Sequence, residues 1–436
     1  MKKTLLITLL LLGIHTTANG KVDAFDGGNN PYLMRSAVPT PKELQQLAEQ
    51  GDAEAQYALG NKYDSGVWSF KQAVDWYRKA AEQGHAGAQN KLGNAYTVGL
   101  GAPKDHTVAC DWYRKAAEQG LANAQYNLGI MYFRGLGVPR NEKLALEWFR
   151  KAADQGHAGA QNYIGLVLTT GRGIPRDDKQ ALEWLRKASE QGHAGAQADL
   201  GFMYLNGRGV EKDAKTAAEW FRKAAKQGDR DAQNNLGFMY ANGLGLPQDN
   251  KLAAEWFRKA AEQVHATAQH NLGVMYEIGQ GIAQEEKLAL EWYRKAAQQG
   301  HATAQLILGL KYSKGQGVPQ DYQQAIKWLS RSSQQGNSAA QNELGVMYAN
   351  GQGVTQDCVL AYALFSIASA NGNLIGTENR DGVAAALTPK QRAEAQVLVT
   401  TGKPNILLPA ESKSGPSSTC NAQSTQITPS ILATEL

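Results

Sequence analysis

The chain has 436 residues, more than one ordinary globular core accommodates and enough for two or three domains. Hydrophobic residues make up 42% of it, so most of the chain can bury a core and is not disordered. The formal charge of +5 falls to +3 once Lys2 and Lys3 are removed, and this small excess argues against a nucleic-acid or membrane-surface binder.

Residues 1–20 are typical of a secretory signal. A positively charged start precedes an apolar stretch from Leu5 to Ile14, and small residues follow at Ala18 and Gly20, where a peptidase can cut. The stretch is too short to span a bilayer comfortably, and an uncleaved membrane anchor is the alternative interpretation. No later run approaches twenty apolar residues, so we expect no transmembrane segment after cleavage and a periplasmic or secreted protein.

The next segments lead into a repeated region. We expect residues 21–40 to form a flexible leader and residues 41–51 to form an N-terminal capping helix that begins near Pro41. The repeats then follow over residues 52–372.

The repeated region is recognised by columns of identical residues with a step of 36. Glycine recurs with this step from Gly99 to Gly351, and glutamine from Gln89 to Gln341. A fixed period of this length indicates a solenoid or an array of repeats. Tryptophan keeps the same step at Trp76, Trp112, Trp148, Trp184, Trp220, Trp256, Trp292 and Trp328.

Each repeat is predicted to hold two helices. In residues 85–120 the apolar spacing predicts a first helix from about Ala86 to Val98, and glycines close it at 99–101. Asp105 is placed to cap the second helix by accepting hydrogen bonds from its free amides. Asp or a close substitute, including Glu285, recurs at this cap. The second helix carries an invariant alanine beside the tryptophan, which predicts close helix packing with the indole between layers.

The ends and one joint of the array depart from the pattern. Leu364 replaces tryptophan in the ninth repeat, as expected for a terminal unit. Residues 373–402 are expected to form a C-terminal capping helix region with Thr388 as N-cap, and residues 403–436 are expected to be disordered. Val264 stands in a glycine column, and since a β-branched residue resists the left-handed backbone, we expect an altered joint there.

The three cysteines do not form a recognisable framework. Cys110, Cys358 and Cys420 are far apart in the sequence, and no pair has the spacing of zinc ligands. Two of them could pair in an exported protein. Cys110 occupies a column held elsewhere by aliphatic residues and is interpreted as a small buried side chain.

The segment from Ala124 to Ala158, AQYNLGIMYFRGLGVPRNEKLALEWFRKAADQGHA, resembles the Sel-1-like repeat, a relative of the tetratricopeptide repeat. The resemblance covers about residues 50–372, and the ending from Leu387 to Leu398 is similar to a terminal helix of bacterial members. It implies an all-α, right-handed solenoid of about nine helix-turn-helix repeats that serves as a protein-binding scaffold. Many members are exported by Gram-negative bacteria.

The search for catalytic residues favours structural roles. Five histidines share one column at the start of the first helix of a repeat, where they suit a helix cap. The Gly-x-Gly loops follow helices rather than strands, so they are interpreted as turns and not as phosphate cradles. Since no nucleophile elbow, zinc-binding His-Glu-x-x-His or Ser-x-x-Lys motif is present, we expect no catalytic residue, metal or cofactor.

The remaining candidate for a functional site is a binding surface. In such arrays the first helix of each repeat usually lines the concave face. Aromatic residues on a rigid groove are good anchors for a partner. The alternative for the column of Ile130, Phe202 and Phe238 is burial between helices. The candidate partner-binding residues are Tyr126, Ile130, Phe133, Arg134, Tyr163, Phe202, Leu205, Asn206, Phe238 and His270.

Three functions are compatible with this reading. The first is a non-enzymatic scaffold that binds a protein or peptide, without nucleic acid. The second is the penicillin-binding or β-lactamase-like activity described for cysteine-rich relatives, which pair two cysteines within each repeat, as this chain does not. The third is a binder of peptidoglycan or another glycan, which aromatic residues along a groove allow.

Overall fold

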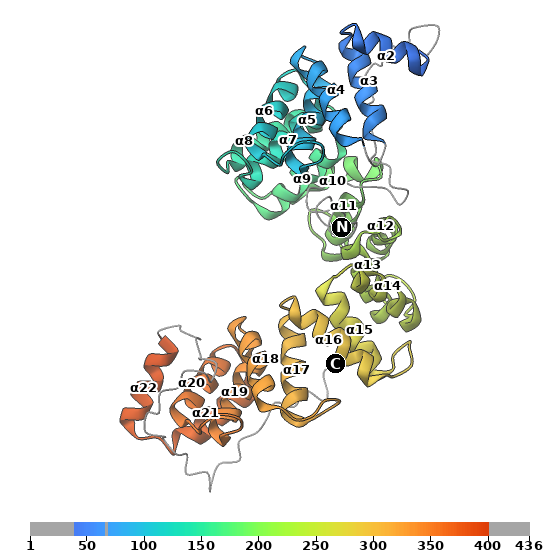
Figure 1. Ribbon diagram of the computed structural model, residues 1–436. Helices are drawn as coiled ribbons and strands as arrows, with labels where there is room; N and C mark the ends of the chain where they lie inside the picture. The colour runs from blue at the N-terminus through green and yellow to red at the C-terminus, as the bar shows by residue number, and fades with distance from the viewer. Residues whose placement is uncertain (1–38, 66–68, 401–436) are drawn as a thin grey trace. The chain divides into compact units, whose positions relative to one another are not determined.

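The computed structural model describes residues 39–65 and 69–400, and all regular elements within these ranges are α-helices (Figure 1). The expected signal segment 1–20, the leader up to residue 38 and the expected disordered segment 403–436 lie outside the described residues. The chain forms two compact units that divide after Lys212. Unit 1 holds α2 to α11, and unit 2 holds α12 to α22.

Each repeat is a pair of antiparallel helices, here called the A helix and the B helix. The nine A helices are α3 (Ala53–Asp64), α5 (Ala86–Val98), α7 (Ala122–Arg134), α9 (Ala158–Thr170), α11 (Ala194–Asn206), α13 (Arg230–Asn242), α15 (Ala266–Ile278), α17 (Ala302–Lys314) and α19 (Ser338–Asn350). The nine B helices are α4 (Phe70–Glu82), α6 (His106–Glu118), α8 (Glu142–Asp154), α10 (Asp178–Glu190), α12 (Ala214–Lys226), α14 (Asn250–Glu262), α16 (Glu286–Gln298), α18 (Tyr322–Gln334) and α20 (Cys358–Ala370). The prediction of an all-α solenoid of nine helical pairs is confirmed.

The histidine column caps the A helices, as the sequence predicts. In each case the Nδ1 atom accepts a hydrogen bond from the amide three residues further on, at distances of 3.0 to 3.3 Å. Asp229 and Asn337 cap α13 and α19 in the same way through a side-chain oxygen. The five capping histidines are His85, His157, His193, His265 and His301.

The predicted acidic column caps seven of the nine B helices, and in the first repeat Ser69 stands at this position and makes no side-chain cap on α4. Asp105 accepts from the amides of Thr107 and Val108, and the equivalent Asp or Asn residues do the same in six further repeats. Glu285 makes no side-chain cap on α16, so that prediction was wrong. Its extra methylene places the carboxylate beyond the short reach that favours Asp, Asn, Ser and Thr at this position.

Close packing within a repeat rests on a glycine of the A helix. A methyl group added at Gly129 of α7 would lie 2.7 Å from the ring of Phe149 of α8. The same contact recurs in other repeats, for example between Gly93 and Tyr113 at 2.4 Å. Only glycine lets the ring lie flat against the A helix. The alanine column of the B helices is fully buried beside this contact.

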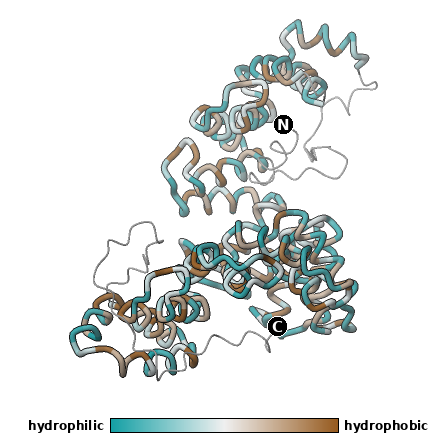
Figure 2. Tube along the Cα trace, turned by 60° about the horizontal axis from the view of Figure 1, so that its bottom comes forward, coloured by the Kyte–Doolittle hydropathy of each residue, from teal (hydrophilic) through white to brown (hydrophobic). Residues whose placement is uncertain are grey.

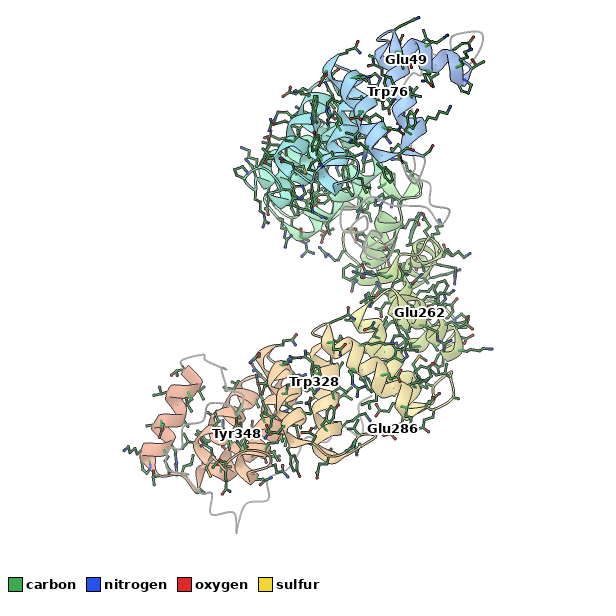
Figure 3. All side chains as sticks on the ribbon, in the orientation of Figure 1. Glu49, Trp76, Glu262, Glu286, Trp328 and Tyr348 are labelled. Carbon is green, nitrogen blue, oxygen red and sulfur yellow. The ribbon has the colours of Figure 1, made fainter. Side chains whose placement is uncertain are left out.

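The tryptophan column joins neighbouring repeats, as predicted. Trp112 of α6 packs against a buried cluster formed by α4 and α5, and Trp148 of α8 packs against the equivalent cluster of α6 and α7. Each indole therefore contacts the hydrophobic layer between its own A helix and the B helix before it. The same arrangement recurs in unit 2 for Trp328, which, like Trp76 of unit 1, is labelled in Figure 3.

The glutamine column links the same three helices through hydrogen bonds. Gln89 of α5 donates to the carbonyl oxygen of Ala81 at 3.1 Å and accepts from Gln119 at 2.8 Å. These buried amides add a second donor to a carbonyl near the end of the preceding B helix, which also accepts from the amide of Gly84 at 3.0 Å. Apolar and polar stretches accordingly alternate along the helices of both units (Figure 2).

Helices at both ends complete the stack. α2 (Pro41–Glu49) stands in for a preceding B helix, because Gln56 donates to its Ala48 carbonyl at 3.0 Å. After the last repeat come α21 (Leu374–Ala384), whose existence as a separate helix was not predicted, and α22 (Pro389–Thr400). α22 begins after Thr388, which accepts from the amide of Gln391 as the predicted cap.

Val264 keeps the hydrogen bonds of its joint but changes the local backbone angles. It is the one non-glycine residue with positive φ among residues 39–65 and 69–400, at 65°. The amides of Val264 and His265 still donate to Ala261 and Ala260 at 3.0 and 3.2 Å. The hydrogen bonds at this joint match those after α16, but φ is 65° at Val264 against 92° at Gly300, and −85° at His265 against −65° at His301. The expected alteration is therefore a local change of backbone angles.

Candidate partner-binding surface

Three large apolar side chains remain exposed on A helices at equivalent positions of successive repeats. Leu166 of α9 is 41% exposed, Phe202 of α11 is 46% exposed and Phe238 of α13 is 47% exposed. Leu and Phe at neighbouring helix positions are buried in the core. Because burial of such side chains is strongly favourable, their exposure in one column marks a surface that suits a partner.

In unit 1 these side chains form a strip on neighbouring helices. α9 and α11 are in contact, so Leu166 and Phe202 lie on adjacent A helices. The half-buried Leu205 follows Phe202 by three positions on the same face of α11, and Phe133 occupies the equivalent position on α7. We call Phe133, Leu166, Phe202 and Leu205 the unit 1 strip.

The strip begins at an aromatic cluster between α7, α8 and α9. The ring of Phe133 meets that of Tyr163 edge-on at 5.1 Å, and Tyr163 stacks on Phe149 at 4.3 Å. Phe149 lies 5.7 Å from Tyr126, which stacks on His157 at 4.6 Å. Ring packing of this kind fixes the orientation of Phe133 and Tyr163 at the surface.

Three candidate residues are covered in part or in full by neighbouring side chains. Ile130 is 6% exposed, so its prediction as a contact residue was wrong and the core alternative holds. Tyr126 is half-buried and held beneath His157, and burial raises the pKa of its hydroxyl. His270 in unit 2 is stacked on His301 at 4.6 Å, so its ring face is also covered.

The remaining polar candidates lie at the C-terminal end of the A helices. Arg134 and Asn206 are exposed there. The side-chain amide of Asn206 donates to the carbonyl oxygen of Phe202 at 2.9 Å, just before Gly207, whose left-handed backbone ends the helix. Phe238 occupies the column of Phe202 in unit 2, where Asn242 makes the same bond at 2.8 Å.

A shallow pocket joins the aromatic cluster to positive charge. Phe133, Tyr163 and Val167 line it together with Arg172 and Glu142. Burial raises the pKa of the Tyr163 hydroxyl, while the positive charges of Arg134 and Arg172 act in the opposite direction. Tyr163 therefore stays protonated at neutral pH and can serve as a hydrogen-bond donor.

The repeats match a known family along most of the described chain. The family model described as Sel1 repeat matches residues 53–85, 86–121, 122–157, 158–193, 194–229, 230–265, 266–301, 302–337 and 338–373. The chain belongs to the Sel1 repeat family.

Two solved structures of Sel1 repeat proteins are similar to this chain. One is a protective antigen present in uropathogenic Escherichia coli strains, with 36% identity over 84% of this chain and 94% of that chain and a TM-score of 0.53. The other is a Sel1 repeat protein from Oxalobacter formigenes, with 36% identity over 55% of this chain and 96% of that chain and a TM-score of 0.52. No curated protein matches this chain.

Groups of reactive side chains are sparse in the described part of this Sel1 repeat protein. Residues 39–65 and 69–400 contain no cluster of three His, Cys, Asp or Glu side chains that could hold a metal ion. Cys110 is fully buried, and burial raises the pKa of its thiol to about 11, so it is the unreactive side chain that the sequence predicts. Nor does any helix in these ranges have the length and apolar character of a membrane span.

Two surface residues escaped prediction. Leu166 lies in the same column as Ile130 and Phe202, so the repeat itself offered the signal. Arg172 stands inside a Gly-x-Gly loop, and the turn motif predicts nothing about the side chain between its two glycines. Leu166 and Arg172 can be recognised as surface residues only from the exposure of their side chains in the structure.

Proposed function

We propose that this Sel1 repeat protein is a non-enzymatic scaffold that binds a protein or peptide along the A-helix face of unit 1. The observation that carries the proposal is the exposure of Leu166 and Phe202 on adjacent helices of a rigid stack. Large apolar side chains at the centre of a fixed surface supply most of the binding free energy in protein interfaces. Sel1 repeats commonly serve in such interactions.

The proposal includes export of the chain to the periplasm or the medium. Its support is the signal-like pattern of residues 1–20, with two lysines before an apolar stretch and small residues after it. N-terminal sequencing of the protein recovered from periplasmic and medium fractions tests this part. An intact Met1 on cytoplasmic protein would contradict export without touching the binding proposal.

The binding experiment compares two double variants. Leu166→Ser with Phe202→Ser removes the exposed part of the strip, while Ile278→Ser with Leu374→Ser removes two exposed apolar side chains of unit 2, at 43% and 80% exposure. Each variant and the parent are used to capture partners from envelope extract, and the captured protein is then purified and titrated by calorimetry. Circular dichroism confirms that both variants keep native helix content.

We expect the strip variant to lose the partner and the unit 2 variant to keep it. Equal affinity of the parent and the strip variant for the purified partner would contradict the assignment of the strip. Burial of two such side chains at an interface is worth several kcal/mol, so the loss should be clear in the measured affinity.

A further inference from the structure

Cys358, the first residue of α20, takes part in a disulfide bond and is 1% exposed. The thiol of Cys110 is free and buried in unit 1. The chain has three cysteines in all, which leaves Cys420 as the partner of Cys358. A bond between them closes a loop that contains α20 to α22 and residues 401–419, so it ties the end of the chain back to the last repeat.

The A helix of the same repeat, α19, is buried on every side. All residues from Gln341 to Ala349 are buried, and a run of this length passes through more than two turns and therefore through all faces of the helix. The equivalent run of α13, residues 233–241, leaves one side open, with Phe238 47% exposed. Val346 corresponds to Phe238 in the repeat and is 6% exposed. α19 is therefore covered on the side that stays open on α13.

The same cover reaches α17. Its residues from Ala304 to Lys311 form a second uninterrupted buried run, in which Leu310 corresponds to Phe238 and is 7% exposed. None of the other A helices contains such a run. The helices that pack closely on α17 are α16 and α18, and α13 has equivalent neighbours in α12 and α14. Helices of the repeats alone therefore do not explain why Leu310 is covered while Phe238 is not.

Residues 401–419 begin beside this surface. The last turn of α22 includes Val399, which packs against the buried cluster that holds Val346 and Cys358. The segment thus starts next to the cluster and, through Cys420, returns to it. Its length of about twenty residues can extend over roughly 65 Å, which is enough to cross neighbouring helices that lie about 10 Å apart.

The composition of this segment suits an apolar surface. Ile406, Leu407 and Leu408 form an apolar run within it. Burial of these side chains against Leu310 and Val346 removes apolar surface of both partners from water, which is strongly favourable. A covalent bond near the end of the segment keeps its effective concentration at the surface high and so favours docking further.

We propose that residues 401–420 dock across α17 and α19 through their apolar run and are fastened by a disulfide between Cys358 and Cys420. The chain then supplies its own occupant for the A-helix face at the end of unit 2, whereas unit 1 presents an exposed strip to a partner. This assignment replaces the disorder that composition predicts for residues 403–420. It concerns unit 2 alone and does not depend on binding by the unit 1 strip.

The disulfide needs an oxidant, because each thiol gives up one proton and one electron. Oxidised glutathione, or the disulfide of a thiol oxidase, accepts both electrons. The thiolate of one cysteine attacks that disulfide and releases one thiol, and the thiolate of the other cysteine then displaces the second thiol from the mixed disulfide. Such bonds persist in oxidising compartments, in agreement with the export proposed from residues 1–20.

Peptide mapping of the full chain tests the bond. The protein is purified in the presence of oxidised glutathione, unfolded in iodoacetamide and digested with trypsin without reduction. We expect fragments 332–380 and 414–436 to form one linked species that separates on reduction, and Cys110 alone to be alkylated. Alkylation of all three cysteines before reduction would overturn the disulfide and the proposal with it.

Hydroxyl-radical footprinting of the oxidised full chain tests the docking. Oxidation of the side chains of Leu310 and Val346 is followed by mass spectrometry, with Phe238 as the exposed reference in the same column. We expect Leu310 and Val346 to be protected in the parent and Phe238 to be modified.

Two triple variants place three aspartates in different parts of the C-terminal segment. The docking variant, with charges in the apolar run, is Ile406→Asp, Leu407→Asp and Leu408→Asp. The control variant, with the same charges beyond Cys420, is Ile427→Asp, Ile431→Asp and Leu432→Asp. Oxidation of Leu310 and Val346 should rise several-fold in the docking variant and stay at the parent level in the control. Circular dichroism confirms that both variants keep native helix content.

The other occupants of this surface give different results. Unchanged protection in the docking variant overturns residues 401–420 as the occupant. Protection that is lost only in the control variant assigns the cover to residues 421–436 and overturns the proposal as well. Protection that falls when the protein is diluted assigns the surface to a second copy of the chain, with the same consequence.

Discussion

The ring of Phe149 fills the space that a side chain at position 129 would occupy, since a methyl group on Gly129 would lie 2.7 Å from it. Gly129→Ala should therefore lower the free energy of unfolding by about 2 kcal/mol, because the core cannot absorb the added methyl without moving the ring. Urea denaturation measures this change. In the Phe149→Ala background the same substitution should cost much less, and additive effects of the two would contradict the contact.

Val264 has a left-handed backbone conformation, which is strained for valine and unstrained for glycine. Val264→Gly should raise the free energy of unfolding by about 1 kcal/mol, since a β-branched side chain is strained at this φ of 65°. Gly300→Val is the converse control, because Gly300 has a φ of 92° and open space where its side chain would point. It should destabilise the protein by a similar amount, and a stabilising effect there would exclude backbone strain as the cause.

Acid should destabilise the stack through its buried histidines. Burial lowers the pKa of His157 to about 4, below the value of roughly 6.5 expected in the unfolded chain. Between these values the unfolded chain binds the proton and the folded chain does not, so stability is present near pH 7 and falls toward pH 4. For His157 the full effect is about 3 kcal/mol, measured by urea denaturation at several pH values.

A capping asparagine separates this titration from the cap itself. Asn337 already caps α19 by accepting from Ala340 at 3.0 Å, so His157→Asn should keep the cap of α9 while it removes the titrating ring. The dependence of stability on pH should become shallower in this variant. An unchanged dependence would show that other groups cause the acid sensitivity.

A charged pair in unit 2 replaces an apolar contact found in other repeats. Lys311 is 7% exposed and pairs with Glu277 at 2.6 Å, and Tyr293 donates to the other oxygen of Glu277 at 2.6 Å. Methionine stands at the equivalent positions 275 and 347. Lys311→Met alone should lower the free energy of unfolding by about 2 kcal/mol, because it leaves a partly buried carboxylate without its cation.

Neighbouring repeats indicate how to restore stability. Repeat 6 carries Ala241 and Phe257 where repeat 7 carries Glu277 and Tyr293. Adding Glu277→Ala and Tyr293→Phe to Lys311→Met therefore removes every member of the polar group. Thermal and urea unfolding should show stability near the parent level, and a triple variant as weak as the single one would contradict this account.

Much of the fold could be predicted because the same capping and packing residues recur in each repeat. The expected bounds of the helix from Ala86 to Val98 agree with α5, and Asp105 caps α6 as its position predicts. Capping and glycine closure act over a few residues, so they can be read locally. α21 was missed as a separate element because it lies beyond the last tryptophan and outside the period.

The candidate surface was harder to predict, since equivalent positions need not share an environment. Ile130 is 6% exposed, while Phe202, two repeats later, is 46% exposed. Tyr126 precedes Ile130 by one helical turn, whereas the small Ala198 precedes Phe202. Periodicity identifies the column but not the exposure, since Phe238 and Val346 both follow an asparagine by four positions and are 47% and 6% exposed.

Each tryptophan side chain packs on helices that lie nearer the N-terminus, so the repeats can assemble from the N-terminus to the C-terminus. Trp112 rests on a layer that includes the B helix before its own repeat, and Trp76 rests on Ala48 of α2 in the same manner. During synthesis, the helices on which each tryptophan packs are translated before the tryptophan itself. Repeats can therefore pack one after another in the order of translation, starting from α2. Each repeat packs on its N-terminal neighbour and needs no contact with a distant part of the chain.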